Sequence, residues 1–344
     1  MSLYSDRPSD TMTGLFSDKG KQSYTVIARF SNGTSVSLHD LNPDVKGMAI
    51  KIFGVVDQQT GESKTVDFTM TNSPTPFGTD QAKFVEFMKA NLWHLKPHPS
   101  SPIEYGYKVG SLPWFLITHP KVAKRLIPAS VPVASVTTQR YWAGHAYLLH
   151  PDQAMKLNMT PVKTAYKNAK LEETIRLAKS EFPLNAPLED QVRNFAAKDN
   201  FNNQHGRLAQ LANTLNKDYL ANDLADRAST YPIKFMLNAQ LEHGGDETPI
   251  EDNLVEWTET HSPSFPVANI TFDPQDARNP ELTAMCERLS FSPGHYVSQH
   301  RPLSNMGRGR IFTYLASAMG RQAQQDISEE EVLQIKRKIA LERK

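Results

Sequence analysis

Three apolar segments in the first part of the chain limit the possible folds more than any other feature. They are "YTVIARF" (24–30), "VKGMAIKIFGVV" (45–56) and "KTVDFTMTN" (64–72). The first is β-branched and aromatic and ends at "SNGT", a turn signal, and "QQTGES" joins the other two as a hairpin connection would. We therefore expect strands that pair in an antiparallel sheet.

Later segments extend this pattern. "RYWAGHAYLLH" and "QAMKLNMTPV" (140–162) predict a hairpin with "PDQ" at its turn, and "IKFMLNAQLEH" and "VANITFD" predict further strands. Helical patterns occupy "QAKFVEFMKANLWHL", the charged section 166–226 and the C-terminal "ISEEEVLQIKRKIALERK", where Ser328 and Glu331 form a capping box. Residues 97–114, rich in Pro, Gly and Ser, predict a loop or crossover. The pattern predicts an α+β fold, with an antiparallel sheet or barrel, helical insertions and C-terminal helices.

Composition excludes several classes of protein. Lys and Arg (38) balance Asp and Glu (37) to a net charge of +1, which does not favour nucleic acid as a partner. No apolar run approaches the roughly 20 residues of a membrane span, and the N-terminal residues lack the apolar region of a signal peptide. The single cysteine, Cys286, excludes internal disulfides and a cysteine-built zinc site. We expect a cytoplasmic protein.

The sequence contains no Walker loop, dinucleotide fingerprint, zinc-protease helix or nucleophile elbow. His145, His150 and His243 are isolated, and for each an ordinary polar or core role is the simpler interpretation. The neighbouring Glu251 and Asp252 fit a solvated loop better than a catalytic carboxylate pair, and "HPHPS" fits a loop better than a metal site.

The segment "GRGRIFTYLASAMGRQ" (307–322) is harder to explain by structure alone. Arg310 lies four residues before Tyr314 and Arg321 seven after it, spacings that return to one face of a helix. The simpler alternative is a buried tyrosine between two solvated arginines. A nearby cation, however, lowers the pKa of a phenol, and a phenolate is an anionic axial ligand for ferric haem. Arg321 could then pair with a haem propionate.

Several motifs together resemble the catalase family. "GRIFTY", with an arginine seven residues after its tyrosine, resembles the family's proximal haem signature. "ARFSNG" resembles the strand that places an arginine on haem and a serine beside the distal histidine, here Arg29 and Ser31. "DFTMTNSPTPFGTDQAKFVEF" resembles the segment of the distal asparagine and a haem-packing aromatic, here Asn72 and Phe84. "DVKGMAIKIFG", "YWAGHAYLL" with "MKLNMTP", "FMLNAQLEH…PIEDNLVEW" and "LSFSPGHYVSQHRPLSNMGRGR" resemble the smaller catalase-related haem proteins, in the family's order.

The resemblance implies a catalase-like antiparallel β-barrel as a single domain over residues 1–344, with its barrel core at about 20–300 and a C-terminal helical part at about 305–344. It implies heme b with ferric iron bound by Tyr314, and hydrogen peroxide or an organic hydroperoxide as substrate. The protein would then be a catalase- or peroxidase-type oxidoreductase. The oligomeric state stays open, a homo-oligomer included.

The resemblance also assigns roles to single residues. Arg310 would stabilise the Tyr314 phenolate, and Arg29 would hold a propionate as Arg321 does. Asn72 would orient peroxide, with Ser31 beside the distal position, and Phe84 would pack on the porphyrin. Three apolar residues on strands beside these positions are candidates for the pocket wall: Val26, Met48 and Ile50.

The sequence departs from the family pattern at two points. The family's catalytic histidine lies upstream of the Arg-Phe-Ser strand, and the 28 residues before Arg29 contain no histidine. Two alternatives follow, a truncated form of an active catalase or peroxidase and a non-catalytic haem-binding protein. Second, the distal polar residue could be Thr71 rather than Asn72, because a one-residue shift reverses the face of a strand.

Overall fold

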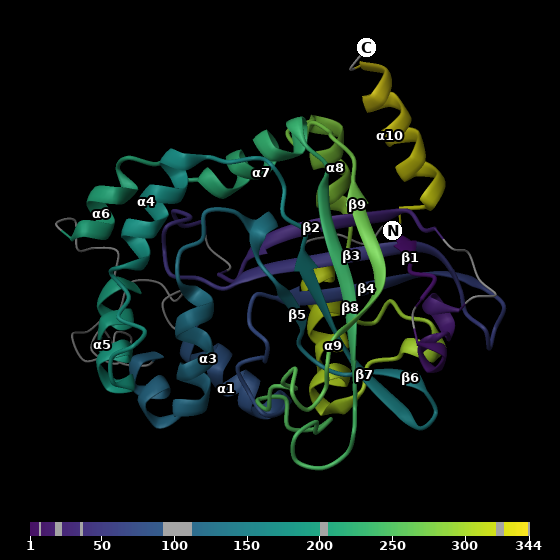
Figure 1. The fold of residues 1–344 in the computed structure, drawn as a ribbon, viewed down its shortest axis with the longest axis horizontal. Helices are drawn as coiled ribbons and strands as arrows, with labels where there is room; N and C mark the ends of the chain where they lie inside the picture. Colours follow the sequence, from purple (N-terminus) through teal and green to yellow (C-terminus); the bar gives the residue numbers. More distant parts are fainter. Residues whose placement is uncertain are drawn as a thin grey trace.

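The computed structural model has a curled antiparallel sheet at its centre, with helices packed around it (Figure 1). It describes residues 1–6, 8–17, 23–34, 37–91, 112–199, 206–320 and 327–342. The predicted haem-site residue Arg321 lies outside these ranges, as does most of the predicted loop at 97–114. The last residues of that loop, 112–114, begin a helix that continues to residue 118.

Nine strands form the sheet in the order β1-β9-β8-β7-β5-β4-β3-β2, and β6 pairs with β7 outside this path. Every pairing is antiparallel, as the three opening segments predict. The strands are β1 (Ser2–Leu3), β2 (Val26–Asn32), β3 (Lys46–Val56), β4 (Ser63–Thr71), β5 (Tyr141–Ala143), β6 (Tyr147–His150), β7 (Gln153–Pro161), β8 (Ile233–Leu241) and β9 (Phe265–Phe272).

The hairpin predicted over 140–162 is present, but its first strand is interrupted. β5 ends at Ala143 and β6 begins at Tyr147, so residues 144–146 leave the sheet. β6 then turns into β7 at the predicted "PDQ", with His150 paired to Gln153. The interruption lets a side chain between the two strands turn towards a helix.

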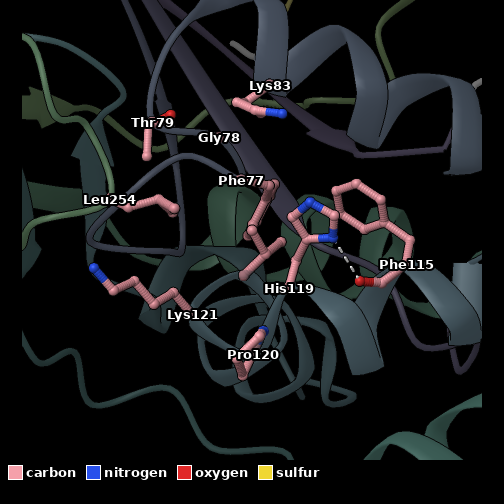
Figure 2. Close-up of a pocket in the computed structure, with 10 residues that line it drawn as sticks. Phe77, Gly78, Thr79, Lys83, Phe115, His119, Pro120, Lys121 and Leu254 are labelled. Atoms are coloured by element: carbon pink, nitrogen blue, oxygen red, sulfur yellow. Dashed lines mark hydrogen bonds between the residues drawn. The ribbon is translucent and has the colours of Figure 1, made fainter.

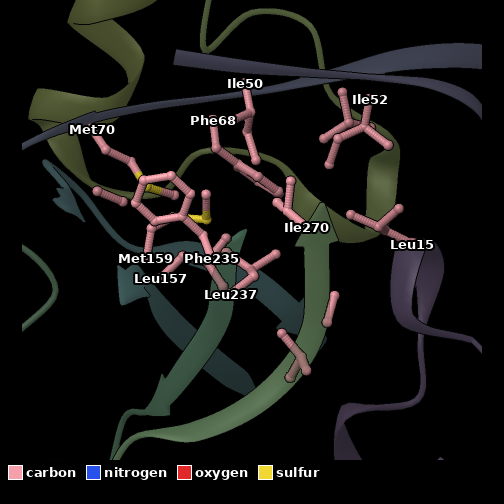
Figure 3. Packing of buried hydrophobic residues seen from close by; sticks show 14 of the residues in the cluster. Leu15, Ile50, Ile52, Phe68, Met70, Leu157, Met159, Phe235, Leu237 and Ile270 are labelled. Atoms are coloured by element: carbon pink, nitrogen blue, oxygen red, sulfur yellow. The ribbon is translucent and has the colours of Figure 1, made fainter. Parts of the chain in front are cut away.

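One face of the curled sheet encloses the main apolar core. Alternate residues of each strand point inward, as the period of two in a strand requires, and they are fully or almost fully buried. Figure 3 shows how side chains from opposite parts of the sheet meet there, among them Ile50, Phe68, Leu157, Phe235 and Ile270. The ring of Phe68 packs edge-on against Tyr147 at 5.2 Å between centroids.

The two ends of the strand order approach each other. Ser2 of β1 forms an isolated antiparallel bridge with Ser23, just before β2. The Met1 amino group donates to the Tyr24 carbonyl at 2.8 Å, and the Tyr24 amide donates to the Met1 carbonyl at 2.8 Å. The sheet therefore curls far enough for its first strand to pair with the segment that leads into β2, which covers part of that edge.

The helices gather mainly on one side of the sheet (Figure 1). The α-helices are α1 (Gln81–Asn91), α3 (Pro120–Ser130), α4 (Ala169–Lys179), α5 (Leu188–Asp199), α6 (Arg207–Ala212), α7 (Tyr219–Thr230), α8 (Pro280–Arg288), α9 (Ser304–Gly320) and α10 (Glu329–Glu342). The described ranges also contain short 3₁₀ helices at Ser9–Thr11, Gly14–Phe16, Val136–Thr138 and Ser298–His300. Within the described ranges, no helix combines the length and apolarity that crossing a bilayer requires.

Separate apolar clusters hold these helices in place. α1, α3 and α5 share one cluster, which includes Phe87, Leu126 and Phe195. α4, α6 and α7 share another with the segment around Val133. At the start of α10, the Glu331 amide is capped by the Ser328 hydroxyl at 3.2 Å, half of the predicted capping box. Within the helical section 166–226, α4, α6 and α7 therefore share one core, and α5 packs with α1 and α3 instead.

Candidate functional site

α9 carries the predicted Arg310 and Tyr314 on one face, one helical turn apart. Arg310 Nη2 donates to the Tyr314 hydroxyl at 3.0 Å and to Thr69 Oγ1 at 2.9 Å. Thr69 lies on β4, 241 residues earlier in the sequence. The guanidinium therefore joins the helix to the sheet as well as contacting the phenol, which excludes the alternative of a solvated arginine at this position.

His145 completes the surroundings of Arg310. It lies in the gap between β5 and β6, is fully buried, and its Nδ1 is 3.0 Å from Arg310 Nη1. A guanidinium has only donors, so Nδ1 must accept and the imidazole proton must be on Nε2. Burial, with the charges of Arg310 and Lys156, holds the pKa of His145 well below its usual value, which agrees with a neutral ring. Its Nε2 has no hydrogen-bond partner among the residues that the structure describes.

The preceding residue explains why this contact is so close. A Cβ on Gly144 would lie 2.8 Å from Arg310 Nη1, which is shorter than any normal contact. Glycine at this position therefore lets the guanidinium approach the gap between the strands. The letters "AGHA" within an otherwise strand-like run were the available signal for His145, but its isolation in sequence gave no reason to connect it with Arg310.

The balance of burial and charge makes Tyr314 unusually acidic. Burial of the phenol opposes ionisation, but the charge and hydrogen bond of Arg310 outweigh it, assisted by Thr69 and by the charge of Arg29. The result is a pKa of Tyr314 below the ordinary tyrosine value. The Arg310 guanidinium also lies 5.3 Å from the centre of the Tyr314 ring. Among the tyrosines of the described chain with a resolved shift, Tyr141, Tyr147, Tyr166 and Tyr219 all shift the opposite way, towards a higher pKa, because burial dominates.

The face of the sheet that meets α9 is lined by small residues. Pairing places Ser31, Gly47 and Thr71 in one row across β2, β3 and β4. The next row is Arg29, Ala49 and Thr69. Gly47, Ala49 and Thr71 are partly exposed. Together these two rows, which we call the α9-facing floor, present a surface of short side chains with one arginine.

The register separates two alternatives for the distal polar residue. Thr71 shares the face of Thr69, because residues two apart on a strand point the same way. Asn72 follows the last residue of β4, and its amide is used within the fold. Its Oδ1 accepts from the Lys46 amide at 2.8 Å and its Nδ2 donates to the Ala129 carbonyl at 2.8 Å. Thr71 is thus the residue of the two that lies on the α9-facing floor.

The remaining predicted residues are placed as follows. Arg29 is stacked over the ring of Phe291, 4.6 Å from its centre, and lies close enough to Tyr314 to lower its pKa. Ser31 is exposed at the end of β2. Phe84 packs on Phe87, 6.0 Å between ring centroids, within the α1 cluster.

None of the three residues predicted for the apolar wall lies on the α9-facing floor. Met48 and Ile50 are buried in the core enclosed by the sheet, on the face opposite Arg29 and Ala49. Val26 packs on the same core and is partly buried. The reason is strand parity, because even-numbered residues of β3 face the core and odd-numbered ones face α9.

A buried ion pair that the sequence reasoning missed lies on the same face as the floor. Lys51 donates to both oxygens of Asp67 at 2.8 Å, and both side chains are almost fully buried. The Nδ1 of His295 lies 2.7 Å from Asp67 Oδ2. A lysine and an aspartate inside two neighbouring apolar strands were a usable signal, since Lys51 and Asp67 are paired directly across β3 and β4.

Comparisons with known proteins agree with this architecture. No protein-family model matches the chain, and no curated protein matches its sequence. Among solved structures, a fungal catalase has a TM-score of 0.65 at 17% identity and covers 94% of this chain and 56% of its own. A bacterial catalase has a TM-score of 0.63 at 17% identity, and the match covers 93% of this chain and 55% of the catalase. Catalase A from Saccharomyces cerevisiae has a TM-score of 0.64 at 15% identity, and the match covers 93% of this chain and 58% of the catalase. The chain thus spans little more than half the length of these catalases. At such identities the likeness is one of fold, and the chain has a catalase-like fold.

Proposed function

We propose that this protein binds ferric haem through Tyr314 and acts on hydrogen peroxide or an organic hydroperoxide. The observation that carries the proposal is the Arg310–Tyr314 hydrogen bond of 3.0 Å, in a setting that lowers the pKa of the phenol. A surface tyrosine has no need of such a partner. A tyrosine that serves as an anionic ligand does, because the phenolate must form near neutral pH.

The residues around Tyr314 fit a flat, anionic cofactor. The α9-facing floor has short side chains, and a Cβ on Gly47 would lie 2.6 Å from Ser31 Oγ, so a larger residue there would require the Ser31 hydroxyl to move. Arg29 supplies a permanent cation at the edge of this floor, suited to a carboxylate. Thr71 and Ser31 supply hydroxyls on the same face. Ferric haem in this position would contribute the redox chemistry of peroxide cleavage.

Each side chain then has a definite task. Arg310 holds the negative charge on the Tyr314 oxygen, and Thr69 fixes the guanidinium by accepting from the same Nη2. His145 accepts from Nη1 while neutral, so it orients Arg310 without adding a second positive charge. We propose that Thr71, rather than Asn72, hydrogen-bonds the peroxide, with Ser31 next to it.

A second candidate function is haem binding without catalysis. Peroxide cleavage uses a general acid–base, and loss of one costs roughly 10²- to 10⁴-fold. On β2, β3 and β4, the residues that share the floor's face include one carboxylate, Asp67, and Lys51 occupies both of its oxygens. This observation favours a haem-binding or haem-handling role.

The first experiment is titration of the purified protein with hemin, followed by its absorption spectrum. We expect a Soret band of the tyrosinate-type ferric form that disappears in Tyr314→Phe, with hemin affinity reduced at least about tenfold. Tyr296→Phe, which changes a tyrosine outside the site, is the matched control and should bind as wild type. An unchanged spectrum in Tyr314→Phe would refute the ligand assignment, and absence of any Soret band would refute both haem functions.

Oxygen release or hydroperoxide consumption by the hemin-loaded protein separates the two candidates. Turnover well above that of free hemin supports the oxidoreductase, and turnover no faster than free hemin supports the binder. The Thr71→Ala variant adds a second criterion, because its turnover should fall while its hemin affinity stays within about threefold of wild type.

A further inference from the structure

A cavity of about 350 Å³ lies beside α1 and α3, and none of Arg310, Tyr314 or Thr69 lines it. Figure 2 shows its surroundings. Three segments distant in sequence meet there, namely the link from β4 to α1, the helix at 112–118 with the start of α3, and the loop around Leu254. Its position separates it from the α9-facing floor.

The wall of this cavity is almost entirely apolar. Phe77 and Val122 are buried, and Phe115 and Leu254 are partly buried beside them. The His119 ring stacks on Phe115 at 4.0 Å with only 10° between the ring planes, which extends the flat wall. Surfaces of this kind accept aliphatic or aromatic groups, since burial of apolar area is favourable by about 25 cal/mol per Å².

Some of the polar groups at the border of the cavity already have hydrogen-bond or ion-pair partners within the chain, and one does not. Lys83 is bound by both oxygens of Glu86 at 3.0 and 3.1 Å, and the Thr79 hydroxyl donates to Asp80 at 3.0 Å. His119 Nδ1 lies 3.0 Å from the Phe115 carbonyl. Lys121, by contrast, forms no ion pair or side-chain hydrogen bond within the described part of the chain. Among the described residues that line the cavity, Lys121 is thus a cation without a partner at its border.

We infer that this cavity is a binding site for a small amphipathic carboxylate, with its apolar body against Phe77, Phe115 and Leu254 and its carboxylate on Lys121. Charge decides the class of ligand, because an apolar cation would meet the positive charge of Lys121 without compensation, and a neutral apolar molecule would leave Lys121 unused. Lys121 is the second residue of α3, so the positive end of the helix dipole adds to the attraction.

The size of the cavity sets the size of the ligand. Small-molecule sites span roughly 300 to 1,000 Å³, so this one is at the lower end. At about 30 Å³ for each water-sized group it holds on the order of a dozen heavy atoms. Decanoate and 4-butylbenzoate both have about this size. Both carry a carboxylate on an apolar body, which is that of a medium-length fatty acid in decanoate and of an aromatic acid in 4-butylbenzoate.

The test is calorimetric titration of the full chain, without hemin, with decanoate below its micelle concentration. We expect one site with a dissociation constant between about 10 µM and 1 mM, and at least tenfold weaker binding of decylammonium. A better fit of 4-butylbenzoate would identify the aromatic source. No binding of either acid, or equal binding of decylammonium, would overturn the inference.

Two pairs of variants locate the site. Lys121→Glu should weaken decanoate binding at least about tenfold. Lys124→Glu makes the same charge change at an exposed position of the same helix and should leave the affinity within about twofold. Equal effects of the two would refute a site at Lys121. Leu254→Trp should fill the cavity and abolish binding, and retained affinity would refute the cavity assignment. If Leu254→Trp lowers the melting temperature, the comparison of Lys121→Glu with Lys124→Glu still locates the site.

Because binding is measured without hemin, this test and the hemin titration give independent results. Failure of the haem function would leave the carboxylate site standing, and the reverse holds as well.

Discussion

At the scale of single residues, the central finding is that the surroundings of Tyr314 set its acidity. The sequence offers Arg310 as a partner by helical spacing, and the structure adds Thr69 and His145 on the other side of the guanidinium. Each added partner reduces the freedom of Arg310 to turn to solvent. A fixed cation stabilises a phenolate more than a mobile one, since the interaction needs no further ordering.

Replacing Arg310 by glutamine tests this directly. Without the cation, burial alone acts on the phenol, and the pKa of Tyr314 should rise from below to above the ordinary tyrosine value. The measurement is a pH titration of the Tyr314 ¹³Cζ resonance, assigned by its loss in Tyr314→Phe. Arg308→Gln, an exposed change on the same helix, is the control. A Tyr314 titration identical in Arg310→Gln and wild type would show that Arg310 does not set its acidity.

At the scale of elements, buried histidines join segments that the sheet alone would leave separate. His300 is fully buried, and its Nε2 accepts from the Leu15 amide at 3.0 Å. Its Nδ1 lies 3.2 Å from the Leu148 carbonyl. The ring must therefore be neutral, with its proton on Nδ1, to connect the 3₁₀ helix at Gly14–Phe16 to β6. Burial lowers the pKa of His300 to about 4.

The stability of the protein should accordingly depend on pH through His300. The pKa of about 4 in the folded protein lies below the ordinary histidine pKa of 6.5, so the unfolded chain binds a proton first as pH falls. The stabilisation is complete above about pH 6.5 and is lost on acidification towards pH 4, by at most about 1.4 kcal/mol per pH unit. Urea unfolding at several pH values measures this slope. His300→Gln should be less stable at neutral pH and show a shallower slope, and parallel slopes would contradict the assignment.

The elements also show what could be predicted from sequence. The positions of strands and helices, such as β2 to β4 and α9, could be predicted because hydrophobic periodicity and turn residues are local features of the sequence. The parity of β3 was not used, so Met48 and Ile50 were assigned to the wrong face. The role of His145 could not be predicted, because its partner Arg310 lies 165 residues away and only the assembled sheet brings the two together.

At the scale of the whole molecule, the curled sheet divides its tasks between two faces. The enclosed face of β4 contributes Phe68 and Met70 to the apolar core, and the other contributes Asp67, Thr69 and Thr71 to the side of α9. Residues that pack in the core therefore alternate along β4 with residues that face the candidate site. This arrangement lets residues of the α9-facing floor change with little effect on the fold.

A pair of substitutions on β4 measures this division. Phe68→Ala opens a cavity in the core and should lower the free energy of unfolding by about 3 to 5 kcal/mol. Thr71→Ala, on the partly exposed face, should cost less than about 1 kcal/mol. Equilibrium urea unfolding of both variants gives the comparison. Similar losses for the two would show that the floor also supports the core.

The long-range partners of Arg310 also determine when, during folding, Tyr314 acquires its lowered pKa. Thr69 and His145 precede it by 241 and 165 positions, and contacts of such separation form only after much of the chain has organised. Until then Tyr314 is an ordinary phenol, protonated and a poor ligand for iron. An incompletely folded chain would for this reason lack the acidic tyrosine on which the proposed haem function depends.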